Sequence, residues 1–367
     1  MIVSLKLINY RNIQSAEIEL SPHLNIIFGE NGVGKSNLLE SAYICAFGRS
    51  FRGKNQQYVR FDSDFARVDA KNPQGESIQI IFLPDGERNI IFNNKKLPRV
   101  SELLGKFPMT YIGPHQVMVV AGSPSERREL LDSHISQFDN EYLDNLRNYF
   151  RSIHQRNAAL RGVAQNDIAG GMILLDSLDE KIAYHGTQII RMRMKFISEL
   201  APICSDIFSA ISNDDSRKIE LEYKCSVAEN PSIEDLEQYF LNRLKSHRNQ
   251  DLKFFQTTIG PHRDDIDIEL DSLPARKFAS WGQVRMIALA IYLSSARIVS
   301  ERIGRTPTIL LDDALAELDP NRARTVLKIA PEIGQIIVAT PHPSHIIDSD
   351  DLKIFEFARP GEIIESK

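Results

Sequence analysis

The stretch Gly29-Glu30-Asn31-Gly32-Val33-Gly34-Lys35-Ser36 decides the fold of this chain. It matches G-x-x-x-x-G-K-[ST], and it directly follows the apolar run Leu24 to Phe28, a predicted strand. In such a loop the glycines let backbone N–H groups and the start of a helix face phosphate oxygens. The lysine reaches the β- and γ-phosphates, and the serine ligates Mg²⁺. The spacing therefore predicts a phosphate-binding loop (P-loop) for ATP and Mg²⁺ that uses all eight residues.

A helix is predicted to follow the loop, as this motif requires. Leu38, Leu39, Ala42, Tyr43 and Ala46 share one helical face, and Gly48 ends the periodic run. Strand, glycine-rich loop and helix thus occur in the order that a nucleotide-binding α/β fold needs.

Composition indicates a soluble globular protein with one large domain or two ordinary ones. The chain has 367 residues, 42% hydrophobic and 25% charged, with a net charge of −5. No apolar run approaches the roughly 18 residues of a membrane helix, and the amino end lacks a signal core, so we expect a cytoplasmic protein without a membrane partner. Cys45, Cys204 and Cys225 lack metal-ligand spacing and are interpreted as buried thiols.

Local basic clusters stand out against the negative net charge. They are Arg49 to Lys54, the pair Arg147 and Arg151, and Arg191 with Lys195 around Arg193. Two interpretations remain open for these clusters: basic rows that contact nucleic acid, or solvated helix faces paired with nearby acids, which the spacing favours.

The pattern along the chain predicts two lobes. The first hundred residues form mostly strands, with a hairpin turn at Asn93-Asn94, and residues 125–244 form a helical insertion broken near Arg161 to Gly171. We expect an out-and-back pair of helices of 25 to 30 residues each, spanning only about 40–45 Å, which is too short for a very long coiled-coil arm. We therefore assign 1–115 and 300–367 to an ATPase lobe with a mixed sheet covered by helices, and 116–299 to a largely helical lobe.

A second acidic element completes the predicted site. The apolar run Ile309-Leu310-Leu311 ends in Asp312-Asp313, which is typical of a Walker B strand. Asp312 would hold Mg²⁺ directly or through water, and Asp313 would orient or deprotonate the attacking water.

Two further stretches indicate the subclass. Ser280-Trp281-Gly282-Gln283 opens an apolar helix and looks like the signature motif of ABC-type ATPases, with Ser280, Gly282 and Gln283 as nucleotide contacts. Ala316-Glu317-Leu318-Asp319 looks like their D-loop. Taken alone, the serine has a helix N-cap as its main alternative interpretation, but the other motifs in register favour the signature. The resemblance implies that the signature of one copy completes the ATP site of a second copy in a dimer.

With these motifs the chain resembles the RecF family of bacterial DNA repair ATPases. The stretches that match are Asn9-Tyr10-Arg11-Asn12, Gly48 to Arg52, Gly122-Ser123-Pro124, Arg127-Arg128 with Asp132, Gln155 to Arg161, and Gly260 to Asp265. The resemblance implies an ATP-dependent homodimer that binds single-stranded, duplex or gapped DNA. It also implies action in recombinational repair and replication restart with RecO and RecR, loading of recombinase at gaps, support of the SOS response, and Arg11 in the nucleotide site.

Two positions, His115 and Trp281, depart from the family pattern. His115 follows Pro114 where the family usually has an acidic residue, and the next residue, Gln116, is our candidate for the catalytic Q-loop glutamine. Trp281 replaces a smaller or polar residue, and the switch position is either Thr340 or His342. Asp313 stands where transporter ATPases use glutamate, and its shorter carboxylate predicts slow hydrolysis. Together with the DNA binding that the resemblance implies, we expect a weak, DNA-stimulated ATPase.

Two other functions share parts of this pattern. An ATPase subunit of a membrane transporter would carry the P-loop and Walker acids, but the long helical insertion between Lys35 and Asp312 is unexpected there. An ATPase-coupled nuclease would have a similar head, but we expect no nuclease domain in the short stretch after Thr340.

Overall fold

The computed structural model describes residues 1–52, 57–164, 171–316, 318–341 and 352–366. Its contacts separate two compact units: unit 1 is Met1–Val117, Asp206–Ser216 and Ser280–Lys367, and unit 2 is Met118–Ser205 and Arg217–Ala279. The predicted division differs at three places, because residues 116–117, 206–216 and 280–299, all assigned to the helical lobe, fall in unit 1. Residues 280–299 belong to a helix that packs on a strand and a helix of that unit.

An antiparallel sheet of six strands forms one layer of unit 1. Its order is β2-β1-β4-β5-β6-β7. The strands are β1 (Ser4–Tyr10), β2 (Ile13–Glu19), β4 (Ala66–Lys71), β5 (Ser77–Phe82), β6 (Arg88–Phe92) and β7 (Lys95–Lys96). The hairpin predicted at Asn93-Asn94 is confirmed, since both residues adopt positive φ, 48° and 63°, between β6 and β7.

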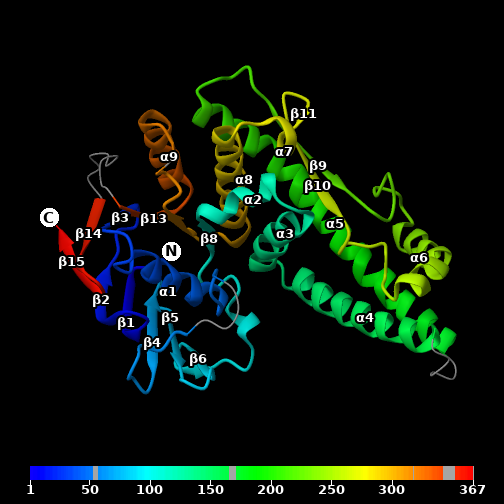
Figure 1. The fold of residues 1–367 in the computed structure, drawn as a ribbon, viewed down its shortest axis with the longest axis horizontal. Helices are drawn as coiled ribbons and strands as arrows, with labels where there is room; N and C mark the ends of the chain where they lie inside the picture. The colour runs from blue at the N-terminus through cyan, green and yellow to red at the C-terminus, as the bar shows by residue number, and fades with distance from the viewer. Residues whose placement is uncertain (53–56, 165–170, 317, 342–351, 367) are drawn as a thin grey trace. The chain divides into compact units, whose positions relative to one another are not determined.

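A mixed sheet forms the second layer of unit 1. Its order is β15-β14-β3-β13-β12-β8, with only β15 antiparallel to its neighbour. The strands are β3 (Leu24–Phe28), β8 (Met109–Ile112), β12 (Thr308–Asp312), β13 (Gln335–Thr340), β14 (Leu352–Arg359) and β15 (Glu362–Ser366). Figure 1 shows β14, near the carboxyl end of the chain, beside β3 near its amino end. Parallel pairing brings the carboxyl ends of β3, β8, β12 and β13 to one edge, which positions the site.

Helix α1 (Lys35–Phe47) packs between the two sheets. It contacts β8, β12 and β13 on one side and β4 and β5 on the other. Because both sides are covered, Glu40, Ser41 and Cys45 are buried along with the predicted apolar face. The predicted stop is confirmed: Gly48 caps the helix in the left-handed region, with φ 62°.

Two helices cover the mixed sheet on the side away from α1 (Figure 1). They are α8 (Trp281–Ile303), which packs on β8, and α9 (Pro320–Ile333), which packs on β13. All five residues of β12 are buried, as expected of a strand covered on both faces. The short elements of this unit are η1 (Val100–Leu103) and η2 (Pro114–Val117).

Unit 2 is mainly helical, as predicted, but it contains a small sheet. Its helices are α2 (Met118–Ala121), α3 (Pro124–Phe138), α4 (Asn140–Ala164), α5 (Gly171–Ser212, whose last residues belong to unit 1), α6 (Leu236–Phe254) and α7 (Ala275–Phe278). Its antiparallel sheet is β11-β10-β9, with β9 (Ile219–Lys224), β10 (Asp265–Leu270) and β11 (Leu273–Pro274).

Two details of the predicted helical insertion were wrong. Strand β9 lies inside the stretch expected to be helical, because its alternating sequence IELEYK pairs with β10. Helix α5 has 42 residues, more than the 25 to 30 expected of each arm helix. At 1.5 Å per residue it is about 63 Å long.

The stretches most particular to the family pattern form buried polar cross-links in unit 2. Arg156 of α4 is fully buried and donates at 2.6 Å both to Asp179 of α5 and to Asp251 of α6. Its neighbour Asn157 accepts from the backbone and hydroxyl of Thr257. Ion pairs this deeply buried link three helices, and removal of one partner would leave a buried charge uncompensated.

The stretch Gly260 to Asp265 makes a second set of cross-links in unit 2. The hydroxyl of Tyr149 lies 2.7 Å from Nδ1 of His262, and the Asp264 carboxylate accepts from Tyr223 and from the backbone of Ser226. Arg127 forms a two-bond ion pair with Asp265. Through these contacts the stretch Gly260 to Asp265 connects helices and strands within unit 2.

No helix in the part of the chain that the structure describes is long and apolar enough to cross a membrane. The cysteine interpretation is confirmed for Cys45 and Cys204, which are buried, while Cys225 is partly exposed. Burial raises the pKa of the Cys225 thiol to about 11.

Candidate nucleotide-binding site

The predicted P-loop turns sharply after β3, and glycine is required at two of its positions. Gly29 has φ 149°, and a Cβ there would lie 3.0 Å from Phe357 of β14. Gly34 has φ 123°, and a Cβ there would lie 2.9 Å from the Asn12 side-chain amide. A larger residue would be strained and would collide at both places. Glu30, Asn31 and Gly32 are exposed, so the crest of the loop is open to a ligand.

Lys35 is the cation of the loop. Its ammonium group donates to the carbonyl oxygens of Gly29 at 2.7 Å and Glu30 at 2.8 Å. Burial lowers the pKa of Lys35, and the nearby carboxylates of Asp313 and Asp312 partly oppose this. A lysine fixed across its own loop in this way is placed to meet phosphate oxygens there.

Ser36 and Asp312 are brought together from opposite ends of the sequence. The Ser36 hydroxyl donates to Oδ1 of Asp312 at 2.9 Å. That separation is close to the distance between adjacent ligands, about 2.9 Å, in an octahedron with Mg²⁺–oxygen bonds of 2.0–2.1 Å. The described residues contain no group of three His, Cys, Asp or Glu side chains suited to a metal. A hydroxyl and one carboxylate fit Mg²⁺ that takes its other ligands from phosphates and water.

Asp312 is held from a second side by an aromatic residue that the sequence did not single out. The hydroxyl of Tyr111 in β8 donates to Oδ2 of Asp312 at 3.1 Å. Burial raises the pKa of Asp312, and the hydrogen bonds from Ser36 and Tyr111 act in the opposite direction.

Asp313 follows the strand in an unusual conformation. Its φ is 51°, in the left-handed region, and its N–H donates to the carbonyl of Ala339 at 3.0 Å. Its Oδ1 is buried and has no hydrogen-bond partner among the described residues. A buried carboxylate oxygen without a partner is suited to accept a proton or a hydrogen bond from a bound water.

Arg11, a predicted nucleotide contact, is held by a buried acid. Its guanidinium donates to both carboxylate oxygens of Glu40, at 2.8 Å and 2.7 Å, and lies 5.6 Å from the ring centroid of Tyr58. Glu40 is fully buried in α1 and also accepts from Tyr10 at 2.8 Å and from Ser50. The role of Arg11 at a nucleotide stays a prediction.

The Q-loop and switch candidates lie at the carboxyl edge of the mixed sheet. Gln116 is in η2, shortly after β8, where its side-chain oxygen accepts from the N–H of Gly113 at 3.0 Å. Thr340 is the last residue of β13. His342, Glu317 of the D-loop and Lys54 of the first basic cluster lie outside the described residues.

Three signature residues, Ser280, Trp281 and Gly282, are exposed at the start of α8, and Gln283 is half-buried. Ser280 caps the helix: its hydroxyl accepts from the N–H of Gln283 at 3.3 Å, and the Gln283 side chain accepts from the N–H of Ser280 at 2.7 Å. Gly282 leaves space, since no atom lies within 4 Å of a Cβ built there. Trp281 has 65% of its surface exposed. The helix start, with its partial positive charge, is thus free to meet an anion.

The basic clusters separate into different environments. Arg147 pairs with Asp144 at 3.2 Å, as the solvated-face interpretation predicts. Arg193 is buried and donates to Asp132 and to the carbonyl of Pro261, both at 2.7 Å, so it does not belong to an exposed basic row. Arg191 and Lys195 are exposed on either side of it.

Sequence reasoning missed two residues that shape the site. Glu40 carried a signal, because it is the one acid in an otherwise apolar predicted helix. Tyr111 carried none, because its contact with Asp312 depends on the pairing of β8 with β12.

A family model described as the RecF/RecN/SMC N terminal domain matches residues 1–362. The chain is 34% identical over 343 residues to the DNA replication and repair protein RecF of Clostridium perfringens, covering 92% of each chain. It is 33% identical over 371 residues to RecF of Clostridium tetani, covering 99% of each.

Solved structures agree with this assignment. The structure of the recombination mediator protein RecF-ATP in the RecFOR pathway superimposes with a TM-score of 0.89 at 30% identity, covering 100% of this chain and 97% of that chain. The Smc head domain of Pyrococcus furiosus, at 18% identity and a TM-score of 0.60, shares the fold. The α/β ABC-type head predicted from the P-loop is therefore confirmed, and the chain belongs to the RecF family of DNA replication and repair proteins.

Proposed function

We propose that this protein is a cytoplasmic, ATP-driven dimer clamp on DNA, with slow ATP hydrolysis as its release step. The observation that carries the proposal is that unit 1 holds an assembled P-loop and, separately, an exposed signature helix start that would act on the site of a second copy. Lys35, Ser36 and Asp312 are assembled around the P-loop, whereas Ser280 and Gly282 are exposed to solvent. A second copy of the chain would supply the missing half.

Different residues of the site would bind the phosphates, hold Mg²⁺ and orient the attacking water. Lys35 and the backbone of the loop would bind the β- and γ-phosphates of ATP. Ser36 and Asp312 would hold Mg²⁺, which when bound neutralises charge on the phosphates. Asp313 would orient a water for attack, and Gln116 follows β8, the neighbour of β12, at the same sheet edge.

Dimer closure would follow from differential affinity. ATP shifts an equilibrium between open and closed forms only if it binds the closed form more tightly. The Ser280 helix start of the partner would add phosphate contacts in the closed form alone, and hydrolysis would remove the γ-phosphate that they recognise.

We assign the clamp to recombinational repair and replication restart, with RecO and RecR as partners. Support comes from the named relatives, which are DNA replication and repair proteins, and from the solved RecF structures of the RecFOR pathway. In this role the clamp would mark gapped DNA for recombinase loading and so support the SOS response.

ATP-dependent retention on DNA tests the proposal. The wild-type protein should stay on gapped DNA with ATP and dissociate without it. Lys35→Ala should show the same retention with and without ATP, because the lysine contact to the phosphates is gone. Tyr239→Phe, a change at an exposed position of α6 that leaves the charge unaltered, is the control. Binding should weaken as salt rises, because phosphate contacts release counterions. Equal retention with and without ATP, or binding indifferent to salt, would contradict the clamp.

A further inference from the structure

Tyr111 reaches the predicted magnesium carboxylate from a neighbouring strand. In the register of β8 and β12, Tyr111 lies opposite Leu310. Asp312 is two residues further along, about 6.6 Å at 3.3 Å per residue, which is within the length of a tyrosine side chain. The hydroxyl meets Oδ2 at 3.1 Å, while Oδ1 accepts from Ser36 at 2.9 Å. Both oxygens of the carboxylate therefore have a defined partner.

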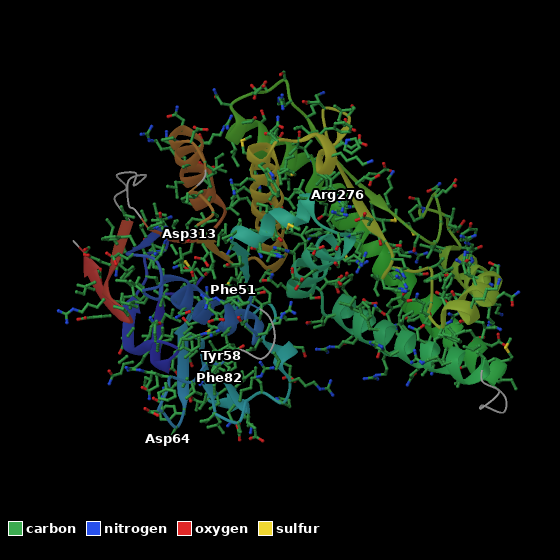
Figure 2. The ribbon with its side chains drawn as sticks, viewed as in Figure 1. Phe51, Tyr58, Asp64, Phe82, Arg276 and Asp313 are labelled. Carbon is green, nitrogen blue, oxygen red and sulfur yellow. The ribbon has the colours of Figure 1, made fainter. Side chains whose placement is uncertain are left out.

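The Tyr111 ring is itself fixed by two aromatic neighbours. It stacks on Phe51, with ring centroids 3.8 Å apart and planes 13° apart, and it meets Tyr43 edge-on at 5.9 Å. Phe51 and Asp313, both of unit 1, are labelled in Figure 2. Stacked and edge-on ring pairs restrict the orientation of a side chain beyond simple burial.

Gly113 leaves room for the hydroxyl. A Cβ at this position would lie 2.3 Å from the Tyr111 hydroxyl oxygen and 2.7 Å from its ring carbon Cζ. Any larger residue would collide with the tyrosine in this orientation. The ring stack, the glycine and the hydrogen bond thus all specify one position of the hydroxyl.

We propose that Tyr111 is a positioning residue of the ATPase site: its hydroxyl holds Asp312 with Oδ1 turned toward Ser36, in the arrangement that Mg²⁺ needs. The inference rests on the proposed function. It differs from a packing role, because the ring alone would fill the space between Phe51 and Tyr43, and only the hydroxyl reaches the carboxylate.

Tyr111→Phe separates these roles, since it keeps the ring and removes the hydroxyl. Binding of ATP is measured by equilibrium dialysis as Mg²⁺ is increased, and again with EDTA. We expect the Mg²⁺ concentration for half-maximal binding to rise about tenfold, the equivalent of one hydrogen bond to a charged group. Binding in EDTA should be unchanged. Tyr239→Phe, the same chemical change at an exposed position of α6, should match the wild type in both conditions.

Two results would overturn the inference. Wild-type Mg²⁺ dependence in Tyr111→Phe would show that the hydroxyl does not position Asp312, and equal loss of binding with Mg²⁺ and with EDTA would show a packing role. A wild-type protein that binds no ATP in either condition would overturn the proposed function itself, and the inference with it.

Discussion

Among single residues, Asp313 combines an unusual backbone conformation with a side chain placed to act on water. Its φ of 51° lies in the left-handed region, which aspartate and asparagine tolerate better than other residues with a side chain. Its buried Oδ1 has no partner among the described residues. The conformation at the end of β12 gives a physical reason for aspartate where transporter ATPases have glutamate.

Asp313→Asn should therefore slow ATP hydrolysis while ATP binding persists. The amide keeps the shape and tolerates the same backbone, but it cannot accept a proton, so we expect a loss of about 10²-fold or more. Single-turnover hydrolysis measures the change. Asp64→Asn, at an exposed position labelled in Figure 2, is the matched control. Unchanged hydrolysis in Asp313→Asn would exclude Asp313 as the residue that activates water.

His134 gives a prediction for pH. Burial lowers its pKa to about 4, below the ordinary 6.5, and its Nδ1 lies 2.8 Å from the carbonyl of Leu130. Because the unfolded chain binds the proton first, the stability from this group is complete above pH 6.5 and falls as pH drops toward 4. At pH 5 the loss is about 2 kcal/mol relative to pH 7.5.

Urea unfolding at pH 7.5 and pH 5 measures this loss. His134→Gln, neutral at both values, should reduce the difference between the two pH values by about 2 kcal/mol. His115→Gln, an exposed change, should leave the difference as in the wild type. The same pH difference in His134→Gln would contradict the assignment.

At the scale of elements, the sequence predicted those strands and helix ends that depend on interactions between residues close in the chain. Strand β3 and the end of α1 at Gly48 agree with the sequence because an apolar run and a helix-stopping glycine act within a few residues. Three features depend instead on sheets assembled from distant segments. They are the burial of α1 on both sides, the hydrogen bonds that Glu40 accepts, and the hydrogen bond from Tyr111 to Asp312. The β9 strand was missed because its partner β10 lies far along the chain.

The helices of unit 2 should depend on Arg156. Arg156→Ala leaves the buried carboxylates of Asp179 and Asp251 without this partner, so we expect a loss of about 3–5 kcal/mol in the free energy of unfolding. Arg161→Ala, exposed on the same helix, should change it by less than about 0.5 kcal/mol. Urea unfolding followed by circular dichroism compares the two. Equal stabilities would show that the buried network contributes little.

For the whole molecule, the chain's single tryptophan reports on dimer closure. Trp281 follows the signature serine and is 65% exposed in one copy. If ATP brings this helix start onto a second copy, the indole leaves water and its fluorescence should shift to shorter wavelength. Lys35→Ala should show no ATP-dependent shift, and a wild-type emission indifferent to ATP would argue against a closing surface at Trp281.

Light scattering of Asp313→Asn with and without ATP tests the central claim most directly. Slow hydrolysis should trap the ATP-bound form, so the account predicts monomer mass without ATP and twice that mass with it. Lys35→Ala should remain at monomer mass in both conditions. The same mass for Asp313→Asn with and without ATP would contradict an ATP-driven dimer.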